Sequence, residues 1–141
     1  MLLGEYKHTI DKKGRVFIPA KLKEALGENF VISKGIGENA ILSVYSMDEW
    51  ARLDEKIKAL GNIESLKVRR FLYSGASTSE CDTQGRILIP QRLREYAELV
   101  DNAYIVGMSD HIEIWNTELW SKESGLETPD SIYKIMEGLN F

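Results

Sequence analysis

The sequence is poor in the residues on which disulfide-bonded, metal-binding and membrane-spanning proteins depend. Its single cysteine, Cys81, cannot form a disulfide within the chain, which favours a reducing compartment such as the cytoplasm. The two histidines, His8 and His111, lack the spacing of metal ligands, so we expect neither a metal nor a cofactor. No apolar run approaches the roughly 20 residues of a membrane helix, and residues 1–5 lack the features of a signal peptide. We therefore expect no membrane partner.

A net positive charge is also lacking. With 18 Lys and Arg against 22 Asp and Glu, the formal charge is −4, which argues against a protein that coats nucleic acid nonspecifically. The charge is unevenly distributed, however. Residues 1–26 hold six cations and three acids, a balance of +3, whereas residues 110–141 hold two cations and seven acids, a balance of −5. This asymmetry permits a local anion-binding face on an acidic protein.

What the chain does contain is an internal repeat. Residues 11–26 begin Asp-Lys-Lys-Gly-Arg-Val-Phe-Ile-Pro, and residues 82–97 begin Asp-Thr-Gln-Gly-Arg-Ile-Leu-Ile-Pro. Aligned over their full length, the two segments share seven identities: Asp, Gly, Arg, Ile, Pro, Leu and Glu. The similarity continues downstream, where residues 28–32 match residues 101–105. Self-similarity of this kind predicts two copies of one supersecondary unit.

Periodicity and turn residues predict the same elements in each unit. Asp11 and Gly14 suit the first and fourth positions of a type I turn that closes a hairpin, with the glycine at positive φ. Pro19 ends the returning strand and begins a helix, which Gly27 closes. The elements expected in the first unit are strands at 5–10, 15–18, 30–33 and 41–45 and helices at 20–26 and 47–60. Those expected later are a hairpin at 76–89, a helix at 91–99, a hairpin at 103–115, a helix at 117–123 and a short helix from Thr128.

Each unit is too small to bury its own sheet well, so the two units are expected to pack together. This arrangement predicts an α+β fold with pseudo-twofold symmetry, in which a small barrel or clasped sheet has helices outside. We expect the first unit and a helical connector at residues 1–70, the second unit at 71–125 and a helical tail at 126–141. Together these segments are expected to form one compact domain overall.

The repeated turn is the strongest candidate for a functional site. Its Asp is expected to bond back to turn amides, while Arg15 or Arg86 leaves the tip on the opposite face from the alternating core residues. With Lys12 and Lys13, the first tip gathers three cations, and guanidinium suits bidentate bonding to phosphate or to guanine. The alternative interpretation is that each Arg pairs with its own Asp and only stabilises the turn.

These residues resemble a known family. The doubled motif, the amino-terminal Gly4-Glu-Tyr-Lys-His-Thr-Ile10 and the segment Phe71-Leu-Tyr-Ser-Gly-Ala-Ser77 are similar to those of the bacterial MraZ proteins, over essentially the whole chain. The resemblance implies a SpoVT/AbrB-type fold, a pseudo-twofold double-split β-barrel of duplicated β-hairpin and helix units with helices outside. It also implies a transcription factor of the division and cell-wall operon, which binds direct repeats in promoter DNA, is associated with the nucleoid and assembles into a homo-oligomeric ring.

The resemblance also implies which residues would contact double-stranded DNA. It places the contact on residues 11–15, above all on Arg15, with Lys12 and Lys13 beside it and Arg86 at the matching position. Neighbours on the preceding strand are Lys7 and His8, and the turn itself would be built by Asp11, Gly14, Asp82 and Gly85. The uncharged Thr83 and Gln84 depart from the first turn, which leaves open whether both tips touch DNA equally.

Two other functional classes stay open. One is a scaffold for the division machinery, whose basic face would meet acidic protein segments. The other is a small hydrolase that uses Asp11 and Asp82 as paired carboxylates. No nucleophile or phosphate-binding glycine loop accompanies these two residues, and Cys81 takes the place of Ile10, which favours packing. We therefore expect no catalytic residues and a protein that is not an enzyme.

Overall fold

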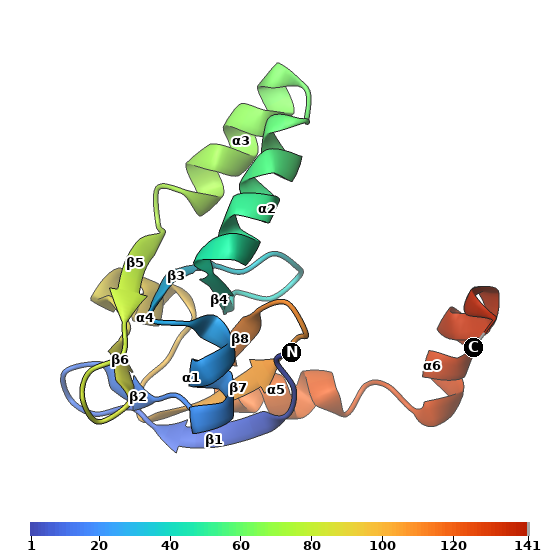
Figure 1. Ribbon diagram of the computed structural model, residues 1–141. Helices are drawn as coiled ribbons and strands as arrows, with labels where there is room; N and C mark the ends of the chain where they lie inside the picture. The colour runs from blue at the N-terminus through green and yellow to red at the C-terminus, as the bar shows by residue number, and fades with distance from the viewer. Residues whose placement is uncertain (141) are drawn as a thin grey trace.

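The order of the structural elements repeats, as the duplicated motif predicts. The computed structural model describes residues 1–140 and is shown in Figure 1. The first unit comprises β1 (Glu5–Thr9), β2 (Arg15–Phe17), α1 (Ala20–Leu26), β3 (Asn29–Lys34), β4 (Leu42–Ser46) and α2 (Met47–Lys58). After α3 (Asn62–Leu72), the second comprises β5 (Ser77–Glu80), β6 (Arg86–Leu88), α4 (Gln91–Tyr96), β7 (Asn102–Gly107), β8 (Ile112–Trp115) and α5 (Thr117–Ser124). The chain continues into α6 (Pro129–Met136) and the 3-10 turn η1 (Glu137–Leu139).

The helices begin and end where local residues dictate. Pro19 precedes α1, and Gly27 ends it at a φ of 83°, as the sequence predicts. The Ser46 side chain caps α2 by accepting a hydrogen bond from the Glu49 amide at 3.2 Å. Helix α4 stops at Tyr96, earlier than predicted, because the chain turns to a positive φ at Glu98, which helical geometry excludes.

The strands pair mainly between the two units rather than within them. A six-stranded sheet has the order β1-β7-β8-β4-β3-β5, and β2 pairs with β6 in a separate two-stranded sheet. Strand β1 of the first unit therefore pairs with β7 of the second, and β5 of the second with β3 of the first. The predicted hairpin connecting β1 to β2 is retained as a closed turn, but these strands share only the bridge Ile10–Val16 before they diverge.

The registers of the pairs follow a pseudo-twofold axis. Val16 faces Ile87 in the β2–β6 pair, and these two residues occupy equivalent places in the repeat. Equivalent Ser43 and Glu113 likewise face each other in the β4–β8 pair. The symmetry and the α+β class are confirmed. The observed pairing leaves β1 and β5 as the edges of the larger sheet, so within residues 1–140 the ladders do not close a barrel.

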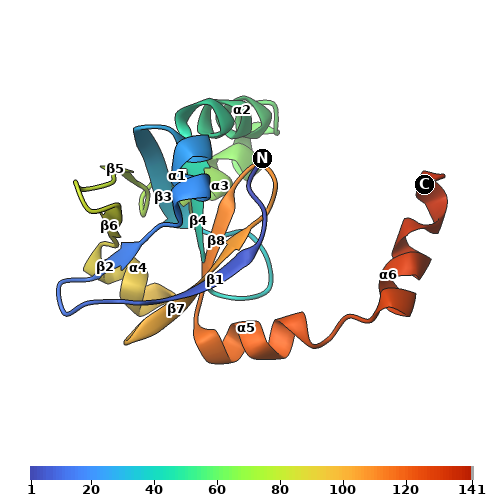
Figure 2. The same ribbon diagram turned by 60° about the horizontal axis from the view of Figure 1, so that its bottom comes forward.

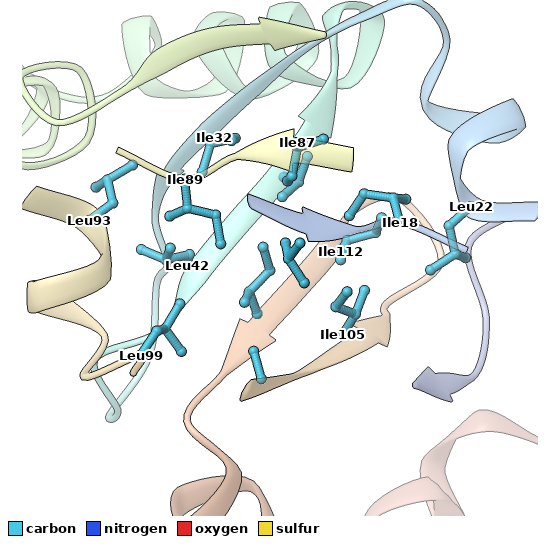
Figure 3. Close-up of a cluster of buried hydrophobic side chains, with 14 of the residues drawn as sticks. Ile18, Leu22, Ile32, Leu42, Ile87, Ile89, Leu93, Leu99, Ile105 and Ile112 are labelled. Carbon is cyan, nitrogen blue, oxygen red and sulfur yellow. The ribbon is translucent and has the colours of Figure 1, made fainter. Parts of the chain in front are cut away.

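The main core lies between the two sheets and the first helix of each unit. Figure 3 shows Ile87 and Ile89 from the second unit directed toward the same interior as Ile18 from the first. Val16, Ile87 and Ile89 have no exposed surface. Leu22 of α1 and Leu93 of α4 close the sides of this interior, as their burial at 2% and 1% exposure indicates. Burial of such side chains contributes about 1.5–3 kcal/mol each relative to exposure.

The outer parts of the molecule are helical. Helices α2 and α3 form a hairpin that projects from the sheets (Figure 1). Helix α5 lies against the larger sheet, where Trp120 packs on Trp115 at a ring distance of 5.3 Å. Helix α6 stands apart from the sheets at the end of an extended segment (Figure 2). None of the helices within residues 1–140 has the length and apolar character needed to cross a bilayer.

The exchange of strands between units predicts that neither half folds alone as a monomer. Cutting the chain at Gly61, between α2 and α3, separates β1 and β2 from their partners β7 and β6. We expect each fragment alone to lack a cooperative thermal transition in circular dichroism, and an equimolar mixture to regain it. A fragment that stays monomeric in sedimentation and still unfolds cooperatively would contradict the exchanged pairing.

Candidate nucleic-acid interface

The two repeated turns have the same backbone. In the first, Oδ1 of Asp11 accepts hydrogen bonds from the amides of Lys13 at 3.0 Å and Arg15 at 2.9 Å. The Gly14 amide donates to the Asp11 carbonyl at 3.0 Å, and the glycine has a φ of 88°. In the second turn Oδ1 of Asp82 likewise accepts hydrogen bonds from the amides of Gln84 and Arg86. In both turns the aspartate therefore accepts from two turn amides and the glycine has a positive φ.

The turn amides hold both aspartates in the charged form. The amide of Arg15 is the main cause that lowers the pKa of Asp11, opposed by partial desolvation and assisted by the guanidinium. Asp82 has a lowered pKa for the same reason, with the amide of Arg86 as the main cause. Because the folded pKa is depressed, these bonds stabilise the fold above the ordinary pKa of 3.8. That stabilisation is lost as the pH falls through the lowered values.

Each arginine pairs with the aspartate of its own turn. Nε of Arg15 lies 2.6 Å from Oδ2 of Asp11, and Nε of Arg86 lies 2.8 Å from Oδ2 of Asp82. These are the contacts that the turn-stabilising interpretation expects. A guanidinium carries five donor hydrogens, and the pair with the turn's own carboxylate uses the Nε edge. The side chains of Arg15 and Arg86 remain 33% and 20% exposed. The contact that stabilises each turn therefore also orients a guanidinium that solvent can still reach.

Antiparallel pairing of β2 with β6 joins the two turns through one short ribbon, with one turn at each end. Arg15 faces Leu88 and Phe17 faces Arg86 across this ribbon, so its outer face alternates guanidinium and apolar side chains. Phe17 and Leu88 are 45% and 53% exposed. The guanidinium of Arg86 lies 6.0 Å from the Phe17 ring centroid, and its Nη1 is 3.8 Å from Oδ2 of Asp11. The two motif pairs thus form one continuous surface.

The first tip is much more basic than the second. Lys12 and Lys13 are exposed beside Arg15. Arg94 joins them, because its Nη1 donates a hydrogen bond to the carbonyl of Lys13 at 3.0 Å. The first tip therefore gathers four cations, Lys12, Lys13, Arg15 and Arg94, and one carboxylate, that of Asp11. At the second tip the corresponding exposed residues, Thr83 and Gln84, are uncharged.

Arg94 was not among the residues that the sequence singled out. It belongs to α4 of the second unit, 81 positions from the residue that it contacts. The only signal in the sequence is that both copies place a cation at this helical position, Lys23 in the first and Arg94 in the second. That signal is weak because cations are common on exposed helix faces.

The two neighbours predicted on β1 lie on opposite faces of that strand. His8 is half-buried and faces β2, where its ring is 6.5 Å from that of Phe17. Lys7 is exposed on the other face, and its ammonium lies 5.9 Å from the Tyr104 ring of β7. Successive strand residues point in opposite directions, so the structure brings His8, but not Lys7, to the ribbon.

Cys81 lies in an open hollow beside the second turn. The hollow has a volume of about 370 Å³ and is lined by Arg15, Ser79, Glu80, Cys81, Asp82, Arg86 and Leu88. Burial raises the pKa of the Cys81 thiol, so the nucleophilic thiolate is disfavoured. No group of three or more His, Cys, Asp or Glu side chains among residues 1–140 is arranged to hold a metal ion.

The fold and the ribbon define a class of protein: a small α+β protein with an internal duplication that presents cationic turns on a pseudo-twofold β-ribbon. A family model described as "MraZ protein, putative antitoxin-like" matches residues 1–70 and 72–125. The chain belongs to the MraZ family.

Curated relatives match over nearly their full length, and each is named Transcriptional regulator MraZ. The relative from Caldicellulosiruptor saccharolyticus is 48% identical over 97% of this chain and 95% of its own. The relative from Heliobacterium modesticaldum is 47% identical over 92% and 90% of the two chains. The relative from Limosilactobacillus reuteri is 46% identical over 99% and 98%.

The two turn glycines offer a matched pair of substitutions. Both have positive φ, so Gly85→Ala should destabilise the fold by about 1–2 kcal/mol through backbone conformation alone. Gly14→Ala should cost more, since its methyl group would lie 1.1 Å from Nη1 of Arg94 and displace that side chain. Urea denaturation of the two variants measures the difference. Equal losses of stability would show that Arg94 moves aside without cost.

Proposed function

We propose that this protein is a sequence-specific DNA-binding transcriptional regulator, and that the first turn, residues 11–15, is its principal contact. The observation that carries the proposal is the cluster of exposed Lys12 and Lys13 with half-buried Arg15 and Arg94 around one turn. An acidic protein that concentrates positive charge at one edge can bind an anionic polymer there, while the rest of its surface does not bind that polymer nonspecifically. The names of the curated relatives support the same class of function.

The geometry supports binding without chemistry. Arg15 is oriented by Asp11, so its remaining donors can meet a base edge or a phosphate with little loss of rotamer freedom. Lys12 and Lys13 would neutralise backbone phosphates, which position a protein on DNA without reading the sequence. A two-stranded antiparallel ribbon such as β2–β6 is narrow enough to enter the major groove. Apolar Phe17 and Leu88 on its outer face suit contact with sugar or with thymine methyl groups.

The proposal extends to the gene targets. We propose that the protein regulates the bacterial division and cell-wall gene cluster, binds direct repeats in promoter DNA and is associated with the nucleoid. Membership of the MraZ family supports this assignment. Linked subunits that engage successive repeats would raise the apparent affinity by roughly 10²–10⁴ over a single contact.

Substitutions in the first turn separate base reading from charge neutralisation. Arg15→Lys retains the charge but not the planar fork, and should weaken binding to promoter repeats by about 1–3 kcal/mol per engaged subunit if Arg15 reads a base. Lys12→Ala should weaken binding to all sequences alike and reduce the salt dependence. Fluorescence anisotropy at two salt concentrations measures both effects, with a duplex from upstream of this protein's own gene and a scrambled duplex.

The control for these variants is Lys67→Ala, which removes an exposed cation from α3, on the helical hairpin that projects from the sheets (Figure 1). It should leave both the affinity and the salt slope unchanged. The proposal fails if Arg15→Lys binds the promoter duplex as tightly as the unaltered protein, or if that protein does not distinguish the promoter duplex from the scrambled one.

We further propose that the protein assembles into a homo-oligomeric ring, and that α6 contributes to the contact between copies. Helix α6 stands away from the sheets (Figure 2), and none of its residues is buried. Ile135 on α6 is 73% exposed, and Leu139, in the turn that follows, is 66% exposed. An isolated helix of eight residues is marginal in water, so packing of its apolar side chains against a second copy would stabilise it.

A charge placed on this helix should disrupt self-association. Ile135→Glu is expected to lower the mass measured by light scattering at micromolar concentration, because a charge cannot be buried unpaired in an apolar contact. Ser124→Glu adds the same charge at an exposed position in α5 and should leave the mass unchanged. An unaltered protein that is monomeric throughout this range would refute the assembly, and an Ile135→Glu variant of full mass would refute the role of α6.

A further inference from the structure

The two turns share a backbone but differ in their surroundings. Gly14 is buried, whereas Gly85 at the equivalent position is half-buried. A Cβ built on Gly14 would lie 1.1 Å from Nη1 and 2.3 Å from Cζ of Arg94, whereas one built on Gly85 would meet nothing within 4 Å. The guanidinium of Arg94 therefore covers the first turn, and the second turn has no such cover.

Arg94 also bonds the turn directly. From α4 its Nη1 donates to the carbonyl of Lys13 at 3.0 Å, in the middle of the basic segment. Only a residue without a side chain at position 14 leaves room for the guanidinium to approach the backbone this closely. The glycine thus has a second reason to be present, in addition to its positive φ.

The equivalent residue of the first unit, Lys23, makes no corresponding hydrogen bond to the second turn in the described part of the chain. Lys23 occupies this position in α1 and is exposed, whereas Arg94 is half-buried. Lys23 is close enough to Cys81 to influence the pKa of its thiol. It donates no hydrogen bond to residues 82–86 in the described part of the chain. A lysine ammonium is a point charge on a flexible stem, while guanidinium is a planar group that can both pack and bond.

We propose that Arg94 is a positioning residue of the first turn, which it holds from the opposite unit in the conformation that engages DNA. The inference rests on the proposed DNA-binding function and deepens it. Lys12, Lys13 and Arg15 project from a backbone segment that is fixed at one end by Asp11 and in its middle by Arg94. Fixing the segment before binding reduces the ordering cost of association. The second turn lacks this restraint, so it makes the lesser contact.

The first measurement tests the restraint in the free protein. Amide hydrogen exchange reports local opening, and the amides of Lys13, Gly14 and Arg15 are all bonded within the turn. Arg94→Ala should accelerate exchange at these amides and leave those of the second turn, Gln84 to Arg86, unchanged. Lys23→Ala, the matched change in the first unit, should accelerate neither turn.

The second measurement tests the consequence for DNA. Against the duplex from upstream of this protein's own gene, Arg94→Ala should bind about 3-fold to 10-fold more weakly, as loss of one hydrogen bond predicts. Arg92→Ala removes the same charge from an exposed position of α4. If Arg94 acts by positioning the turn, Arg94→Ala should lose more DNA affinity than Arg92→Ala. The salt dependence of binding should be the same for the two variants.

Arg94→Lys keeps the charge and the helix, and covers the case in which the alanine variant does not fold. It should show faster exchange in the first turn and weaker DNA binding than the unaltered protein. The inference is overturned if Arg94→Lys matches the unaltered protein in both measurements, or if Arg94→Ala binds no more weakly than Arg92→Ala. Failure of the unaltered protein to bind the duplex would instead refute the proposed function, and the exchange data would still decide whether Arg94 restrains the turn.

Discussion

The central contact between the two repeat units is the pairing of β2 with β6. It places Val16 against Ile87 in the interior, where both have no exposed surface, and so joins the two units at their centre. The same antiparallel pairing places the two turns at the two ends of one short ribbon, because each turn leads directly into one of these strands. Further bonds cross between units there, from the Ile18 amide to Gly85 and from the Ile89 amide to Gly14. The strand pair that forms the centre of the core therefore also positions the two turns of the basic edge.

The contact between aspartate and arginine has two physical effects. Asp11 organises the turn by accepting from two of its amides, and it fixes Arg15 through Nε. A guanidinium held on one edge loses less rotamer freedom when its other edge meets a ligand. Stabilisation of the turn and recognition of an anion, which are alternatives when only the sequence is considered, are compatible in the structure.

Local features could be predicted from the sequence, whereas contacts between the units could not. Asp11 and Gly14 define the turn through backbone conformation, and Pro19 and Gly27 bound α1, since these effects act within a few residues. The alternation of Val16 and Ile18 gives the buried face but not its partner strand, because either copy of a duplicated hairpin offers a similar surface. The contact of Arg94 with Lys13 joins residues 81 positions apart and leaves no periodic pattern.

Duplication within one chain removes a constraint that identical subunits impose. In a dimer of separate chains both turns must have the same residues, whereas here Lys12 and Lys13 are matched by Thr83 and Gln84. The pseudo-twofold core is kept while the charge at its edge is not symmetric. The two halves of a palindromic DNA site are related by a twofold axis, as are the two halves of a symmetric protein surface. Direct repeats, in contrast, all run in the same direction along the DNA. A basic edge that is stronger at one tip therefore suits the proposed direct repeats better than a symmetric edge would.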